Sequence, residues 1–123
     1  MPHLLFIEDD HDVRLMMEHV LLSEGFDVDT AETRARGAEL LEGRRYDLVI
    51  ADARLPDGSG LTLADTAEAL GIPALIITGY AFALQSDAPD FDFSKHAMIL
   101  KPVRPAELLE AVGRILEQDF PLG

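Results

Sequence analysis

The sequence predicts an α/β domain in which helices cover both faces of a five-stranded parallel sheet, an arrangement known as doubly wound. Short apolar runs of strand length alternate along the chain with segments whose apolar residues recur at helical spacing. The connections between these segments are short, which favours right-handed β-α-β crossovers and therefore parallel strands. Such a sheet commonly has the strand order 2-1-3-4-5, with its ligand crevice between the ends of strands 1 and 3.

The first half of the chain contains three predicted strands and two predicted helices. The predicted strands are 3–7, 26–30 and 48–51, the last of which runs directly into Asp52. The predicted helices are 11–24 and 32–43. The first and third strands are continuous apolar runs, as in strands covered on both faces, whereas the second alternates apolar and polar residues. Asp10 or Asp12 is the expected cap of the first helix, and Gly25 is its expected stop.

The second half continues the alternation of strands and helices. Its predicted strands are 73–77 and 97–100, and its predicted helices are 61–70 and 105–117. Pro105 suits the first turn of the last helix, because proline is tolerated where the backbone N–H has no partner. Between these elements, residues 81–96 are the least regular. Asp87, Pro89 and Asp90 argue against a long helix there, so the fourth helix is expected to be short or irregular.

Composition narrows the class of protein. A chain of 123 residues is expected to form one domain, and 23 acidic residues against 10 basic ones give a net charge of −13, which disfavours direct binding to nucleic acids. The absence of cysteine excludes disulfides and thiolate chemistry. No apolar run approaches the roughly 20 residues that span a bilayer. The N-terminus does not resemble a signal peptide, so we expect a cytoplasmic protein without a membrane partner.

Carboxylates follow two strands that the predicted topology makes neighbours. Glu8 and Asp9 come directly after the first strand, and Asp52 ends the third. Three like charges in one crevice would repel each other. A hard divalent cation that prefers oxygen ligands relieves this repulsion, and Mg²⁺ is the best candidate. A carboxylate beside such an ion can attack a phosphoryl group and form an acyl phosphate.

Two later strand ends supply further partners for a phosphoryl group. Thr78 can donate a hydroxyl to one phosphoryl oxygen and Lys101 can place an ammonium group on another. Each residue alone has an ordinary interpretation as a cap or turn residue, but their order at successive strand ends favours a site. Asp57 fits a turn better than a ligand set. The histidines share no ligand spacing and are predicted to be surface or capping residues: His3, His11, His19 and His96.

Four motifs resemble the receiver domain of two-component response regulators over essentially the whole chain: FIEDD, LVIADARLPDGSG, ALIITG and ILKP. The resemblance implies a flavodoxin-like, CheY-like sheet and a phosphoacceptor at Asp52. The phosphoryl group would come from a sensor histidine kinase or a histidine phosphotransfer protein. Phosphorylation would then switch contacts with a downstream protein target or relay the phosphate. Such a domain is not an enzyme, because it catalyses only its own phosphorylation and dephosphorylation.

The resemblance also implies a role for each site residue. Asp9 and Asp52, with the main-chain carbonyl of Arg54, would bind Mg²⁺, and Glu8 would act through water. Thr78 would be the switch hydroxyl and Lys101 the phosphate-pairing lysine. These two residues occupy the family's positions at the fourth and fifth strand ends.

Other positions depart from the family's pattern. Met98 stands where the family's switch aromatic usually lies, three residues before the lysine. The sequence Thr78-Gly79-Tyr80 partly resembles a subgroup of single-domain regulators named for a Phe-Ala-Thr-Gly-Tyr-like motif. Tyr80 is then a candidate substitute for the missing aromatic. We hypothesise that Arg54 and Tyr80, each two residues after a site residue, shield the acyl phosphate from water.

Residues 118–123 follow the last predicted helix, so we expect a single receiver domain over 1–123, without an output domain, that is a monomer or weak dimer. Its output would use the face formed by the fourth helix, fifth strand and fifth helix.

Three alternative interpretations of the sequence remain. A haloacid-dehalogenase-like phosphatase would use Asp10 as nucleophile, although a late acidic pair and a cap are missing. A pseudo-receiver would bind partners without phosphorylation. A flavodoxin-like cofactor carrier is disfavoured, because acids after the first strand would repel the flavin phosphate.

Overall fold

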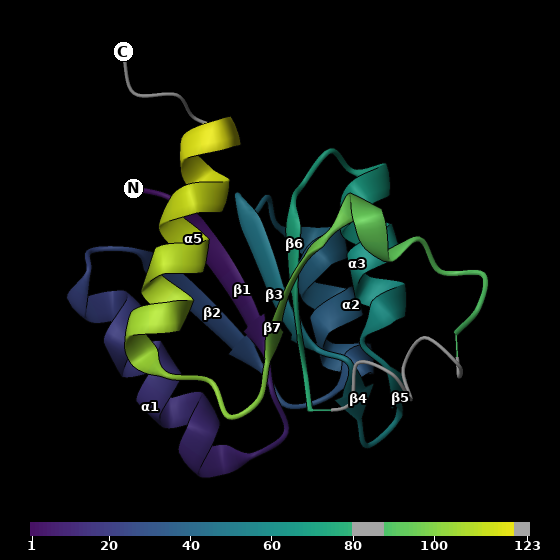
Figure 1. The fold of residues 1–123 in the computed structure, drawn as a ribbon, viewed down its shortest axis with the longest axis horizontal. Coiled ribbons are helices and arrows are strands. Elements are labelled where there is room, and N and C mark those ends of the chain that lie inside the picture. The colour runs from purple at the N-terminus through teal and green to yellow at the C-terminus, as the bar shows by residue number, and fades with distance from the viewer. Residues whose placement is uncertain (80–87, 120–123) are drawn as a thin grey trace.

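A five-stranded parallel sheet in the order β2-β1-β3-β6-β7 forms the centre of the molecule (Figure 1). The computed structural model describes residues 1–79 and 88–119. The strands of the sheet are β1 (His3–Ile7), β2 (Asp27–Ala31), β3 (Leu48–Asp52), β6 (Ala74–Thr78) and β7 (Ala97–Leu100). Since β6 and β7 are the fourth and fifth strands of this sheet, both the predicted fold class and the predicted strand order are confirmed.

Helices cover both faces of the sheet, as predicted (Figure 1). They are α1 (His11–Ser23), α2 (Arg34–Gly43), α3 (Leu61–Ala69) and α5 (Pro105–Asp119). One apolar core joins α1 and α5 to one face, and Phe6, Met17 and Val112 are among its buried residues. The other core joins α2 and α3 to the opposite face around Ile7 and Leu63. Both faces of the central strands β1, β3 and β6 are therefore covered, which is why these strands are apolar on both faces.

Capping interactions determine where two of the helices begin. Asp10 accepts a hydrogen bond from the backbone N–H of Val13 at 3.1 Å and is the N-cap of α1. Thr33 caps α2 in the same way, so this helix starts two residues later than the predicted residue 32. The second strand lies one residue later than predicted, because its pairing with β1 extends to Ile7 and Ala31.

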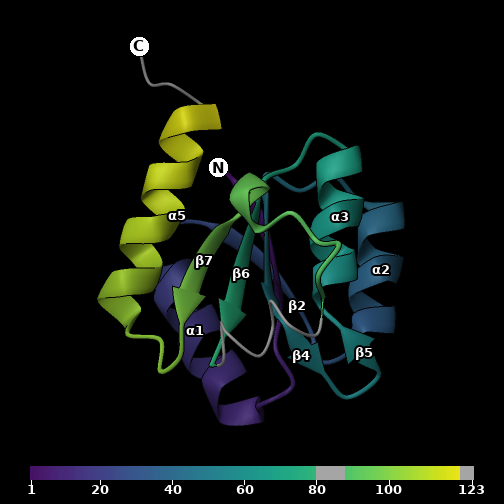
Figure 2. The same ribbon diagram turned by 45° about the vertical axis from the view of Figure 1, so that its right-hand side comes forward.

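A short antiparallel hairpin, β4 (Arg54–Leu55) and β5 (Gly58–Ser59), follows β3 where the sequence predicted only a turn. Asp57 at its tip accepts hydrogen bonds from the backbone N–H groups of Arg34 and Ala35 at 2.8 and 2.9 Å. The start of α2 is thus capped twice, by the hydroxyl of Thr33 and by the carboxylate of Asp57 in the hairpin loop. Figure 2 shows the hairpin at the same edge of the sheet as the carboxyl ends of β6 and β7.

The predicted short or irregular fourth helix falls on residues 81–96, of which 81–87 lie outside the described residues. The described part, 88–96, contains a 3₁₀ helix, η1 (Phe93–Lys95). Of the two alternatives predicted for His96, a surface or a capping residue, the structure supports the second, because His96 is the C-cap residue of η1. Its side chain is only 3% exposed, because the imidazole stacks on the ring of Phe91 with the centroids 5.3 Å apart.

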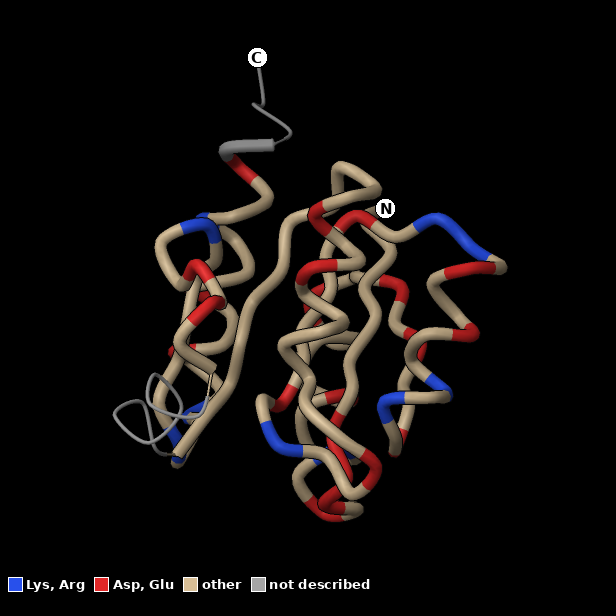
Figure 3. The backbone as a smooth tube through the Cα atoms, turned by 90° about the vertical axis from the view of Figure 1, so that its right-hand side faces the viewer, with Lys and Arg blue, Asp and Glu red and all other residues tan. Residues whose placement is uncertain are grey.

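Acidic residues are spread over the helices and loops and outnumber the basic ones in Figure 3, in keeping with the net charge. None of the helices in the described part of the chain has the length and apolar character needed to cross a bilayer.

Candidate functional site

The predicted site residues gather at the carboxyl edge of the sheet. Glu8 and Asp9 follow β1, Asp52 ends β3, Thr78 ends β6 and Lys101 follows β7. The parallel register brings these strand ends side by side. Asp52 pairs with Ile77, the residue before Thr78, and the backbone N–H of Lys101 donates to the Thr78 carbonyl at 2.9 Å. The topology therefore assembles at one edge residues that are far apart in the sequence.

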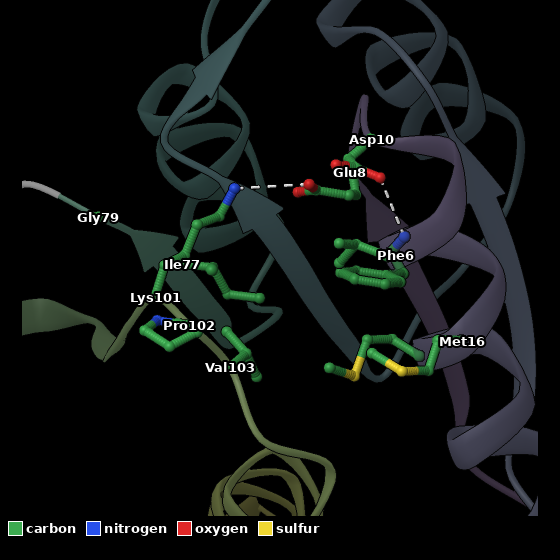
Figure 4. Close-up of a pocket in the computed structure, with 11 residues that line it drawn as sticks. Phe6, Glu8, Asp10, Met16, Ile77, Gly79, Lys101, Pro102 and Val103 are labelled. Atoms are coloured by element: carbon green, nitrogen blue, oxygen red, sulfur yellow. Dashed lines mark hydrogen bonds and ion pairs between the residues drawn. The ribbon is translucent and has the colours of Figure 1, made fainter.

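Lys101 connects two buried carboxylates. Its Nζ lies 2.5 Å from Oδ2 of Asp52 and 3.4 Å from Oε1 of Glu8, and Figure 4 shows it extending from the end of β7 toward Glu8. The side chains of Glu8 and Asp52 are 1% and 6% exposed. Burial alone would lower the pKa of Lys101, but the hydrogen bond to Asp52 and the two negative charges raise this pKa above its ordinary value.

Glu8 has an unusual proton affinity. Burial first, and then the hydrogen bond and the negative charge of Asp52, raise the pKa of Glu8 to about 8, although Lys101 acts in the opposite direction. In the metal-free protein, the Glu8 carboxyl therefore binds its proton more tightly than an ordinary glutamate does. Asp52 also accepts a hydrogen bond at Oδ1 from the backbone N–H of Arg54, at 3.0 Å. A proton on Glu8 thus offsets part of the negative charge in the crevice, and a metal ion can replace this proton.

The carboxylates of Glu8, Asp9 and Asp52 can meet at one ion, because one oxygen from each lies within 4.8 Å of the others. Glu8 and Asp52 are buried and Asp9 is exposed, so the group opens to solvent on one side. Carboxylate oxygens are the donors that Mg²⁺ prefers, and Mg²⁺ commonly keeps several waters that a phosphate can replace. This donor set fits the ion that the sequence predicts.

Arg14, which the sequence analysis did not single out, holds the backbone at the site. Its side chain is 8% exposed, and Nη1 donates to the main-chain oxygen of Glu8 at 3.0 Å. Its Nη2 lies 3.0 Å from Nδ1 of His11 and donates to Glu32 at 3.3 Å. The sequence contains a pattern that could have identified this residue, since Arg14 is on the same helical face as the buried Met17. A buried cation on such a face needs specific hydrogen-bond partners.

Gly60 lies directly against the phosphoacceptor candidate. A Cβ atom built there would be 1.8 Å from the main-chain oxygen of Asp52. The backbone angles of Gly60 are ordinary (φ −68°, ψ −13°), so the close approach of two chain segments is what requires glycine. The residues of the turn after β3 do not by themselves indicate that position 60 must be glycine.

Two of the residues predicted to modulate the site, Gly79 and Met98, lie in different parts of the fold. Gly79 lines a cavity of about 570 Å³ together with Glu8 and Lys101 (Figure 4). Met98 is half-buried and packs against the core on the α2 and α3 side of the sheet. Tyr80 lies outside the described residues, so the hypothesis that it shields an acyl phosphate remains a prediction.

Asp10, the nucleophile of the alternative phosphatase interpretation, caps α1 with one oxygen. It also lines the cavity in Figure 4, but it does not belong to the group of Glu8, Asp9 and Asp52 around a possible ion. The arrangement therefore favours Asp52 over Asp10 as the reacting carboxylate.

Comparisons with known proteins agree with this arrangement. A family profile described as "Response regulator receiver domain" matches residues 4–113. The transcriptional regulatory protein GlrR of Escherichia coli K12 is 31% identical over 121 residues, covering 97% of this chain and 27% of that protein. The aerobic respiration control protein ArcA of the same strain is 30% identical over 129 residues, covering 99% of this chain and 51% of that protein. The chain thus spans between about a quarter and about half of the length of these relatives.

Solved structures show the same fold. A CheY-like response regulator receiver domain protein from Methanospirillum hungatei aligns with a TM-score of 0.83 and 29% identity, covering 97% of each chain. The response regulator TrrA from Thermotoga maritima, solved in complex with Mg²⁺ and BeF, aligns with a TM-score of 0.81 and 27% identity. That alignment covers 94% of this chain and all of the other.

Proposed function

The chain belongs to the response regulator receiver domain family of two-component signal transduction, and from this premise we propose that Asp52 is its phosphoacceptor. The observation that carries the proposal is the pairing of Asp52, buried at the end of a central strand, with the Lys101 ammonium group at 2.5 Å. The alternatives without phosphorylation, or with Asp10 as nucleophile, give this pairing no role in their chemistry.

The proposed reaction transfers a phosphoryl group from a phosphohistidine. An oxygen of Asp52 attacks phosphorus, the P–N bond breaks, and the imidazole nitrogen leaves with the electron pair, so that an acyl phosphate forms on Asp52. The backbone N–H of Arg54, 3.0 Å from Oδ1, keeps the carboxylate in one orientation. Attack of water on the acyl phosphate later returns the free carboxylate and inorganic phosphate. The chain in this account acts only on itself.

The transferred group carries negative charge on three oxygens, and each needs a partner. Lys101 would move its ammonium from the two carboxylates to one phosphoryl oxygen, and Thr78, at the neighbouring strand end, would donate its hydroxyl to another. Asp9, Asp52 and the main-chain carbonyl of Arg54 would hold Mg²⁺ directly, and Glu8 would hold it through water. When bound, Mg²⁺ supplies positive charge to the phosphoryl oxygens during transfer. The complex of TrrA with Mg²⁺ and BeF supports Mg²⁺ as the ion in this proposal.

The partners in this proposal are a sensor histidine kinase or a histidine phosphotransfer protein as donor and a downstream protein as target. The 23 acidic residues outnumber the 10 basic ones and give a net charge of −13, which supports protein partners over nucleic acid. We place the exchange in the cytoplasm. Arg54, Gly79, Tyr80 and Met98 would modulate the lifetime and the output of the phosphorylated form.

Chemical mapping tests the identity of the nucleophile. The protein is incubated with Mg²⁺ and a small acyl-phosphate donor and then reduced with borohydride, which converts an acyl phosphate on aspartate into homoserine. Peptide mass spectrometry should find homoserine at position 52. Homoserine at position 10 would instead support the phosphatase interpretation, and an unmodified chain would support the pseudo-receiver.

A further inference from the structure

A second group of possible metal ligands lies between α3 and the segment that leads into β7. It consists of Asp65 and Glu68 on α3 and His96, the residue before β7, and one ligand atom from each lies within 4.8 Å of the others. Because His96 precedes β7 whereas Lys101 follows it, this group lies at the opposite edge of the sheet from Asp52. It therefore belongs to a different part of the fold from the proposed phosphorylation site.

The imidazole of His96 is the observation that points to a ligand. Its side chain is 97% buried, yet its Nε2 atom has no hydrogen-bond partner among residues 1–79 and 88–119. This atom faces the carboxylate of Glu68, with Oε2 at 3.8 Å, a distance too long for a hydrogen bond. Buried polar atoms are almost always paired, so an orphan nitrogen aimed at a carboxylate pair needs an explanation.

The two carboxylates are placed to complete a site. Asp65 and Glu68 are three residues apart on α3 and therefore lie on one face of the helix. Glu68 is in the last turn of α3, where the negative end of the helix dipole favours a cation, and Asp65 lies one turn before the helix end. Lys95 forms an ion pair with Oε1 of Glu68 at 3.2 Å, which leaves Oε2 on the side of His96.

We propose that Asp65, Glu68 and His96 bind a divalent transition-metal ion of the Zn²⁺ type. An imidazole nitrogen combined with carboxylates favours such an ion over Mg²⁺, which prefers oxygen ligands only. Bonds of about 2.1 Å in a tetrahedral site place ligand atoms roughly 3.4 Å apart. Both carboxylates are exposed, so side-chain rotation can bring the present separations to that value, and water completes the fourth position.

A bound ion would connect α3 to the start of β7. Because β7 carries Lys101 at its other end, the ion would fix the strand that delivers the phosphate-pairing lysine. It would also stabilise the folded protein, since the three ligands come together only in the native structure.

Isothermal titration calorimetry on the untagged protein tests the site. Zn²⁺ is added in the presence of excess Mg²⁺, so that the acidic crevice near Asp52 is occupied. The parent should bind one Zn²⁺ per chain. His96→Asn, Glu68→Gln and Asp65→Asn should each weaken this binding by about tenfold or more. Since the two carboxylates are exposed, their variants should fold even if His96→Asn does not.

Matched controls separate this site from general attraction to acidic residues. Asp90→Asn removes a negative charge from the same part of the chain, His19→Asn removes an exposed histidine, and both should bind Zn²⁺ like the parent. The ¹⁵N chemical shift of His96 Nε2 should change on addition of Zn²⁺. The proposal is overturned if Zn²⁺ does not bind, or if its binding survives loss of His96, Glu68 and Asp65 but not Asp52→Asn.

Discussion

The ammonium group of Lys101 lies 2.5 Å from the carboxylate of Asp52, although the two residues are 49 positions apart in the sequence. The same ammonium also reaches Glu8 at 3.4 Å, so one cation partly neutralises two buried acids. Before phosphorylation the lysine holds the carboxylates, and after phosphorylation the acyl phosphate would attract it. In the proposed function, the lysine would thus be the partner of the carboxylates before phosphorylation and of the phosphoryl group afterwards.

Lys101→Met should destabilise the metal-free protein, because it leaves two buried carboxyl groups without their cation. We expect a loss of about 1–2 kcal/mol in the free energy of unfolding, less than for a fully buried pair because Lys101 is 37% exposed. Urea denaturation with a chelator present measures this change. Lys95→Met, which removes an exposed ion pair, should change the same quantity by no more than about 0.5 kcal/mol. Equal effects of the two substitutions would contradict the account.

Glu8 should make the stability of the metal-free protein depend on pH. Its pKa rises from 4.5 to about 8 on folding, so between these values the folded state binds more protons than the unfolded state. The free energy of unfolding should therefore fall as the pH increases from about 4.5 to about 8. Denaturation of the parent and of Glu8→Gln at several pH values measures this slope. The variant should lose this contribution, and an identical slope in both proteins would show that Glu8 does not carry it.

Arg14→Met should weaken the site without touching a proposed ligand side chain. The substitution keeps an apolar stem on α1 but removes the donor to the main-chain oxygen of Glu8. An unsatisfied buried carbonyl costs about 1–3 kcal/mol, so both stability and the affinity for Mg²⁺ should fall. Denaturation and calorimetry measure the two effects. The exposed Arg36→Met is the matched control and should leave the affinity unchanged.

Gly60→Ala should disrupt the region around the phosphoacceptor. Its Cβ would overlap the main-chain oxygen of Asp52, and moving that backbone should cost about 3 kcal/mol or more. The control is Gly113→Ala on α5, where a Cβ meets open space. That substitution should raise the free energy of unfolding by about 0.5–1 kcal/mol. A stable Gly60→Ala protein with normal phosphorylation would contradict the packing described here.

The sequence was sufficient to predict the parts of the fold that local patterns control. Periodicity located the strands, and the topology of parallel sheets then placed Asp52 beside Glu8 and Lys101 before any contact was known. Their roles in phosphorylation stay predictions until the chemistry is measured.

Other features depend on the three-dimensional surroundings of single groups. The raised pKa of Glu8 follows from its burial against Asp52, which no local pattern encodes. Arg14 interrupts an apolar helical face, and only the position of the Glu8 carbonyl explains why a cation is buried there. His96 is buried because the ring of Phe91, five residues earlier, stacks on its imidazole. Such contacts are made between elements and cannot be read from periodicity.

Intact-mass spectrometry on the parent and on Asp52→Asn tests the central claim most directly. Both proteins are incubated with Mg²⁺ and a small acyl-phosphate donor and sampled at short times, with a chelator-treated parent as the control. We predict one added phosphoryl group on the parent and none on Asp52→Asn or on the chelated sample. A phosphoryl adduct that persists in Asp52→Asn, or a parent that never gains one, would contradict the assignment of Asp52 as the phosphoacceptor.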